Sequence, residues 1–378
     1  MENTHWKEIE VNLRTPGPIP IPDEILLASG KQMINHRGPE FQDLLNNISK
    51  GLKHIYRTDN DVLTLTGSGT GSMEAAIVNT LSPGDEVLSV SIGVFGDRFA
   101  QIAEAYGATV ERLTFTWGTS IDPDVLREAL KKNNNVKAVL VTHNETSTGV
   151  TNDLESIGKV VKEFDKLFIV DAISSLSSLP FYTDEWNCDI VVAGSQKGWM
   201  VAPGLSFISV SPKGWDAFKE SKMPKFYWDI GKAKSYMDRG QTPWTPALAI
   251  LYGLEVSLNM IINEGLENVY TRHSTVANKI REGVKSLGLK LFADEKCASN
   301  TVTSVDIPDG IDAKTLLQTL QSDHQLVLAG GQGSLDGKIM RIGHMGYIGD
   351  NEITHTIESL KSGLEKVGFH PNHSETRG

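Results

Sequence analysis

The stretch Asp189-Ile-Val-Val-Ala-Gly-Ser-Gln-Lys-Gly-Trp-Met-Val-Ala-Pro203 decides how this chain folds. An apolar run typical of a buried strand ends here in a turn of small residues, and the turn carries Lys197 where the strand stops. A second run, Leu167-Phe-Ile-Val-Asp171, ends in an aspartate. Continuous apolar strands are typical of sheets covered on both faces. The pattern therefore predicts one sheet that presents a lysine and a carboxylate at its strand ends.

Four further apolar runs, at residues 62–65, 86–90, 137–141 and 206–210, alternate with helical patterns. Residues 72–81 place Met73, Ile77 and Leu81 on one helical face. Asp122 and Asn152 are the predicted N-caps of two more helices. The alternation predicts an α/β domain with a mainly parallel sheet.

The chain divides into four predicted parts. Residues 1–22, with four prolines, form an extended arm, and residues 23–258 form the large domain. A helix over 246–262 links it to a smaller α+β domain over 259–369, with strands near 301–305, 325–329 and 338–342. Residues 370–378 are a polar tail that we expect to be disordered.

Composition narrows the class of function. The chain of 378 residues is 39% hydrophobic and carries a net charge of −11, which argues against nucleic acid or an anionic membrane as partner. Its two cysteines lack metal-ligand spacing, so we expect neither a disulfide framework nor a metal site. No signal peptide or 18-residue apolar span is present. We therefore expect a soluble cytoplasmic protein.

A glycine-rich turn, Thr66-Gly-Ser-Gly-Thr-Gly-Ser72, joins a predicted strand to a predicted helix. Such a turn offers backbone N–H groups and the positive helix end to a phosphate, and Ser68 and Thr70 add hydroxyls. It is neither a P-loop nor a complete dinucleotide fingerprint. A tight turn without a ligand is an equal alternative.

Other candidates also follow strand ends. Phe95, flanked by glycines, suits stacking on a planar cofactor, although core packing explains a single aromatic ring better. Thr146 offers a hydroxyl in a loop that is otherwise read as solvated, and Arg341 suits a two-pronged grip on a carboxylate or a structural ion pair. Lys197 and Asp171 together supply an imine-forming amine and a carboxylate for a pyridinium nitrogen, the groups that pyridoxal phosphate enzymes need most.

The sequence resembles the class V aminotransferases of fold-type I, in particular the alanine-glyoxylate and serine-glyoxylate aminotransferase group. The resemblance rests on Thr15-Pro-Gly-Pro18, His36-Arg-Gly-Pro-Glu-Phe41, His143-Asn-Glu-Thr-Ser-Thr-Gly149, Val170-Asp-Ala-Ile-Ser-Ser175, Gly194-Ser-Gln-Lys-Gly198 and Arg341-Ile-Gly-His-Met-Gly346. It covers nearly the whole chain.

The resemblance implies a role for each matching residue. Lys197 would bind pyridoxal 5'-phosphate as an imine, and Asp171 would pair with its ring nitrogen. Arg341 would bind the substrate carboxylate, and the arm around Gly17 would help close the pocket. The other cofactor contacts implied are Ser68, Gly69, Thr70 and Gln196 at the phosphate, Phe95 stacked on the ring, Thr146 at the ring hydroxyl, and Thr245 and Gln241 from the second subunit of a homodimer.

The implied activity is ping-pong transamination. Lys197, displaced by an amino acid, would become the general base at the substrate Cα. Alanine or serine would be the donor and glyoxylate or pyruvate the acceptor. A related aminotransferase for a phosphonate or for ureidoglycine is the main alternative. A cysteine desulfurase is disfavoured, since Leu328-Ala-Gly-Gly-Gln-Gly-Ser334 holds no cysteine. A non-catalytic accessory subunit and a dinucleotide oxidoreductase are weaker options.

Overall fold

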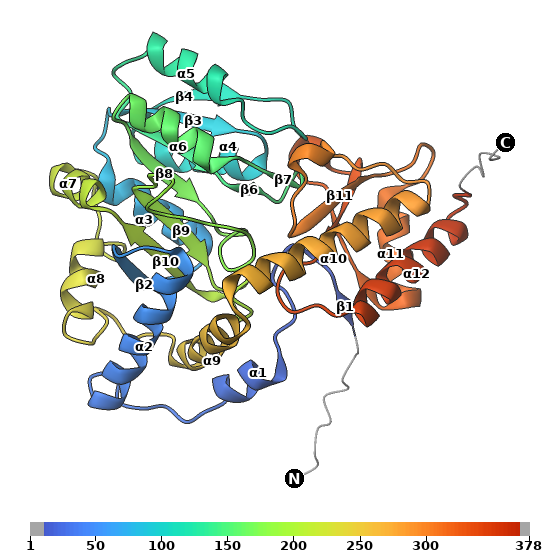
Figure 1. Cartoon of the computed structure of the whole chain (residues 1–378), viewed down its shortest axis with the longest axis horizontal. Coiled ribbons are helices and arrows are strands. Elements are labelled where there is room, and N and C mark those ends of the chain that lie inside the picture. The colour runs from blue at the N-terminus through green and yellow to red at the C-terminus, as the bar shows by residue number, and fades with distance from the viewer. Residues whose placement is uncertain (1–10, 371–378) are drawn as a thin grey trace.

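A seven-stranded sheet forms the centre of the computed structural model, which describes residues 11–370 (Figure 1). The strand order is β2-β10-β9-β8-β5-β3-β4, and β10 alone runs antiparallel to its neighbours. The mainly parallel sheet predicted from the sequence is thus confirmed. The strands are β2 (Asp61–Gly67), β3 (Glu86–Ser91), β4 (Thr109–Thr114), β5 (Ala138–Thr142), β8 (Leu167–Asp171), β9 (Ile190–Gly194) and β10 (Gly204–Val210).

Apolar cores cover both faces of this sheet. Alternate residues of one strand enter different cores: Val139 and Val141 belong to one, and Ala138 and Leu140 belong to the other. Strands β5, β8 and β9 are buried along their whole length, which explains their unbroken apolar sequences. Strand β4 lies at the sheet edge and is largely exposed, so its Thr-Val-Glu-Arg-Leu-Thr sequence gave no apolar run to predict it.

Helices pack around the sheet, and their caps test two predictions. Asp122 accepts from the backbone N–H of Asp124 (2.9 Å) at the start of α5, as predicted. Asn152 does not cap α6; Asp153 does, because the Asn152 side chain is bonded to Ile121 N and to Thr142 O. The helices of this part are α1 (Asp23–Ser29), α2 (Pro39–Tyr56), α3 (Gly69–Thr80), α4 (Val94–Ala105), α5 (Pro123–Lys132), α6 (Leu154–Glu163), α7 (Pro212–Glu220), α8 (Ile230–Met237) and α9 (Leu248–Glu264).

The C-terminal part has a core of its own, built on α10, which runs from the large part into the small one (Figure 1). The predicted strand at 325–329 is two short strands with different partners, since β12 pairs with β1 of the arm and β13 pairs with β14. The elements are α10 (Leu266–Ser286), β11 (Val302–Asp306), α11 (Ala313–His324), β12 (Leu326–Val327), β13 (Ala329–Gly330), β14 (Ile339–Gly343) and α12 (Asp350–Lys366). The domain boundaries at residues 22, 258 and 369 stay predictions.

Residues 11–22 of the predicted arm follow the small sheet before they reach the large part. Strand β1 (Asn12–Leu13) pairs with β12, and the carbonyl of Arg14 accepts from Gly343 N at 2.6 Å. Residues 1–10 of the predicted arm and 371–378 of the predicted tail lie outside the described residues. Within residues 11–370, no helix combines the length and the apolar character needed to span a membrane.

Candidate active site

Lys197 and Asp171 meet at the carboxyl edge of the sheet. Asp171 is the last residue of β8, and Lys197 follows β9, the next strand, in the turn after Gly194. Their side chains are only 3% and 9% exposed. Burial lowers the pKa of Lys197 to about 8, against the opposing charge of Asp171, and burial raises the pKa of Asp171 to about 6. The two predicted groups therefore share one buried site.

Each of the two groups has a defined hydrogen-bond environment. The Asp171 carboxylate accepts from Ile173 N at 2.9 Å and from Thr142 Oγ1 at 3.4 Å, so its direction is fixed by the strand end. The Lys197 amine donates to the carbonyl of Pro16 in the arm. A Cβ on the next arm residue, Gly17, would lie 2.6 Å from Lys197 Nζ, so the arm borders this lysine directly. The role of Gly17 in closing the pocket stays a prediction.

The glycine-rich turn packs too tightly for larger residues. A Cβ on Gly69 would lie 2.7 Å from Ile173 Cδ1, and one on Gly71 would lie 2.4 Å from the ring of Trp228. Ser68 caps α3 by accepting from Gly71 N at 3.3 Å. The turn thus places the N-terminus of α3, with its free N–H groups, beside the strand ends.

Gln196 supplies an independent sign of a ligand at this turn. A Cβ on Gly194 would lie 3.2 Å from both Gln196 Oε1 and Gly69 Cα, so the amide lies against the start of α3. Gln196 Oε1 is buried and has no hydrogen-bond partner among residues 11–370. A buried polar atom without a partner is costly, and a phosphate bound here would accept from the same amide turned by 180°. The residues therefore fit the phosphate of pyridoxal phosphate.

Phe95 lies in the first turn of α4, and its ring is half-buried. The guanidinium of Arg98, one turn on, lies 4.7 Å from the ring centroid. Arg98 also interacts electrostatically with Asp171 and Lys197, which places α4 at the same site. The stacking role of Phe95 stays a prediction.

Arg341 and Thr146 lie together, since Arg341 Nη1 donates to Thr146 O at 3.2 Å. Arg341 is 6% exposed, and its other bonds go to Gly330 O (2.8 Å) and Gln332 Oε1 (3.3 Å). Among residues 11–370, no carboxylate forms an ion pair with it. The structural ion pair considered from the sequence is therefore not found within 4 Å there, although the buried carboxylate of Glu145 acts on Arg341 electrostatically. The carboxylate-binding role of Arg341 stays a prediction.

Gln241 and Thr245 lie on the connection between α8 and α9. Gln241 Oε1 accepts from Arg37 Nη1 at 3.0 Å, and Thr245 is exposed. No hydrogen bond in the described part of the chain joins either of them to Lys197 or to the glycine-rich turn. Their contact with the phosphate was predicted across a dimer interface, and it stays a prediction.

Three residues of the site escaped the sequence reasoning. Trp228 packs against the glycine-rich turn from a loop that is distant in sequence, and no local sequence pattern predicts this contact. Arg98 stands three residues after Phe95, a helical spacing that would have placed it beside that ring. Glu145 was read as part of a solvated loop, yet it is fully buried.

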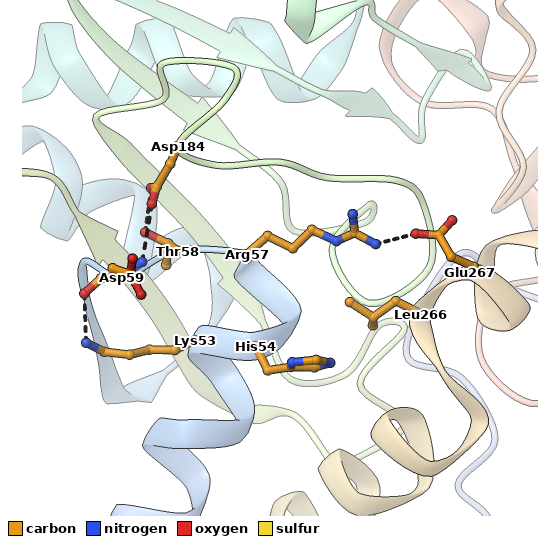
Figure 2. Close-up of a pocket in the computed structure, with 8 residues that line it drawn as sticks. All are labelled: Lys53, His54, Arg57, Thr58, Asp59, Asp184, Leu266 and Glu267. Carbon is orange, nitrogen blue, oxygen red and sulfur yellow. Dashed lines mark hydrogen bonds and ion pairs between the residues drawn. The ribbon is translucent and has the colours of Figure 1, made fainter.

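The hollow drawn in Figure 2 is a different place. It lies where α2 meets the start of β2 and of α10, at the opposite end of β2 from the glycine-rich turn, and encloses about 570 Å³. Arg57 pairs with Glu267 there, and Lys53 donates to the backbone carbonyl of Asp59 at 3.0 Å (Figure 2). Within residues 11–370, no three His, Cys, Asp or Glu side chains gather as metal ligands do.

A buried lysine and aspartate at neighbouring strand ends, a phosphate-type turn and a buried arginine define a pyridoxal phosphate-dependent transaminase of fold-type I. Residues 25–348 match the family model for class V aminotransferases, and the chain belongs to that family.

Relatives match over nearly the whole chain. The soluble hydrogenase small subunit of a Synechococcus species is 43% identical and covers 94% of both chains. The serine-glyoxylate aminotransferase of Methylorubrum extorquens is 36% identical and covers 93% of this chain and 90% of its own. The crystal structure of an alanine-glyoxylate aminotransferase from a Nostoc species superposes with a TM-score of 0.92 at 31% identity, over 96% of this chain and 98% of its own.

Proposed function

We propose that this transaminase moves an amino group from alanine or serine to glyoxylate or pyruvate at the site around Lys197. The observation that carries the proposal is the joint burial of Lys197, Asp171 and an arginine, Arg341, that has no carboxylate partner among residues 11–370. The relatives that act on serine, alanine and glyoxylate by name support the choice of small substrates.

The cofactor site follows from the same geometry. When bound, pyridoxal phosphate supplies an electron sink that stabilises negative charge at the substrate Cα. The N–H groups of Gly69 and Thr70, the Ser68 hydroxyl and the Gln196 amide would hold its phosphate. Phe95 would stack on the ring, Thr146 would bond the ring hydroxyl, and the Asp171 carboxylate would keep the ring nitrogen protonated.

Lys197 would hold the cofactor and then move the Cα proton. Both tasks need a neutral amine, and burial makes the neutral form accessible by lowering the pKa of Lys197 to about 8. The Pro16 carbonyl accepts from this amine and so directs its lone pair away from the arm. Arg341 would bind the substrate carboxylate through two N–H groups, in exchange for Gly330 O and Gln332 Oε1. The arm beside Lys197 would limit the size of the substrate side chain, because a Cβ on Gly17 would already lie 2.6 Å from Lys197 Nζ.

We further propose a cytoplasmic homodimer in which Thr245 and Gln241 of one subunit complete the phosphate site of the other. Large apolar side chains that are exposed in the single chain support an interface: Leu27 is 77% exposed and Phe226 is 72% exposed. The two cysteines, Cys188 and Cys297, are free thiols, which fits a reducing compartment. Light scattering of the purified protein tests the dimer.

The visible absorbance of the purified protein tests the activity. A yellow band that L-alanine or L-serine bleaches and glyoxylate restores is the expected result. Lys197→Ala should fold and show neither change, which ties the band to this lysine. A yellow band that neither donor alters would shift the assignment to other amines, ureidoglycine or phosphonates first. A protein that takes up no pyridoxal phosphate would contradict the proposal.

A further inference from the structure

We propose that Glu145 is a positioning residue, whose buried carboxylate fixes the start of α4 and thereby the ring of Phe95 against the cofactor. The inference rests on the proposed function, because it concerns the stacking face of the same site. It assigns a task to a buried charged group that the chemistry at Lys197 does not use.

The contacts of Glu145 join two parts of the site that are far apart in sequence. Its side chain is 0% exposed, and Oε2 accepts from Phe95 N at 3.0 Å and from Gly96 N at 3.1 Å. Ser147 Oγ accepts from Val94 N at 3.0 Å. The first three N–H groups of α4 are thus bound by a loop fifty residues further on, while Gly93 at the N-cap contributes no side chain.

A carboxylate suits this place better than any neutral group. While Oε2 receives two backbone donors, Oε1 receives Ser147 N at 3.1 Å and Ser147 Oγ at 2.5 Å. An amide of the same shape would turn its NH₂ toward one of these pairs of donors. The positive N-terminus of α4 favours the negative charge. Burial raises the pKa of Glu145 to about 7, against the bonds from Ser147 and Gly96, so the group is ionised above that pH.

The glycines around Phe95 follow from this packing. A Cβ on Gly93 would lie 2.5 Å from both Glu145 Cγ and Ser147 Oγ, and one on Gly96 would lie 2.9 Å from Ser91 Cα. Arg98 lies over the Phe95 ring at 4.7 Å. Glu145 therefore holds the backbone at Phe95, and Arg98 holds the ring of Phe95.

The test compares Glu145→Gln with the wild type by two readouts, the dissociation constant of pyridoxal phosphate and the visible circular dichroism of the bound cofactor. We expect the affinity to fall about 10- to 100-fold, as for loss of charged hydrogen bonds, and the dichroic band to weaken because the ring loses its fixed platform. Asp153→Asn is the matched control. Asp153 caps α6 by accepting from Ser156 N at 3.1 Å, a bond that asparagine can also accept, so the same carboxylate-to-amide change there leaves both readouts unchanged.

A double-mutant cycle tests whether Glu145 affects cofactor binding through Phe95. If Glu145 acts through Phe95, Glu145→Gln has little further effect on the affinity once Phe95→Ala is present. Provided that the wild type binds the cofactor, either of two results would overturn the inference. The first is full additivity of the two substitutions in their effect on affinity, and the second is a Glu145→Gln protein with wild-type affinity and dichroism. Should Glu145→Gln not fold, Ser147→Ala serves instead: it keeps the charge of Glu145, removes one donor to Glu145 and the acceptor of Val94 N, and should weaken binding by about 3- to 10-fold. A wild type that binds no cofactor would overturn the proposed function first.

Discussion

Replacement of Gly17 by alanine should disable the enzyme while leaving it folded. Gly17 has a φ of +113°, a region that side chains rarely adopt, so alanine costs about 1–3 kcal/mol of folding free energy. Its Cβ would lie 2.6 Å from Lys197 Cδ and Nζ and 2.8 Å from Cε. Since carbon atoms prefer about 3.5–4.0 Å, the arm or the lysine must move by about 1 Å. Displacement of this size costs on the order of 10²-fold in rate.

Steady-state transamination of alanine with glyoxylate, together with thermal unfolding, measures both effects. Gly84→Ala is the control, because Gly84 also has a positive φ (+85°) but no atom of the described residues 11–370 lies within 4 Å of its Cβ position. It should lose stability of similar size and keep full turnover. A Gly17→Ala enzyme whose turnover stays within about 3-fold of wild type would refute the reasoning, because the estimate of 10²-fold rests on that displacement.

Four further changes test the remaining parts of the site. Asp171→Asn should lower turnover by about 10²-fold or more, since a neutral amide lacks the negative charge that stabilises a protonated ring nitrogen; single-turnover rates would show it. Gly71→Ala places a Cβ 2.4 Å from the Trp228 ring and should weaken cofactor binding in an equilibrium titration, whereas unchanged affinity would exclude this packing. Arg341→Lys should raise KM for alanine about 10-fold with a smaller change in kcat. Because burial lowers the pKa of Lys197 to about 8, cofactor capture by the unloaded protein should accelerate as pH rises through 8, and a rise delayed beyond pH 10 in stopped-flow absorbance would contradict it.

The lowered pKa of Lys197 also determines how the free energy of unfolding changes with pH. Between pH 8 and its ordinary value of 10.5, Lys197 is protonated in the unfolded chain and neutral in the unloaded fold. The unfolded state then binds more protons, so the free energy of unfolding should increase with pH across this window.

The strand ends were predictable because a strand that is buried on both faces has a continuous apolar sequence. The apolar runs before Asp171 and Lys197 needed no tertiary information, and their shared edge followed from the parallel topology. Strand β4 was missed for the opposite reason, because an exposed edge strand keeps no apolar pattern. Asn152 and Asp153 are both good caps, and only the tertiary bonds of Asn152 decide between them.

The residues that support the candidate active site could not be predicted from the sequence. Trp228 contacts the glycine-rich turn although more than 150 residues separate them in the sequence. A tryptophan in a loop does not indicate which segment it packs against. Glu145 resembles any polar loop residue until α4 is known to begin against it. The predicted contacts of Thr245 and Gln241 concern a second subunit, which a single chain does not contain.

Helix α10 has a consequence for how the molecule unfolds. Leu266, Val269 and Tyr270 in its first half pack in a core of the large sheet, whereas Val276, Ile280 and Val284 in its second half pack in the small core. Because helix formation is cooperative, melting either half removes hydrogen-bonded neighbours from the other. The two cores are therefore thermodynamically linked through this one helix, and each part draws stability from the other.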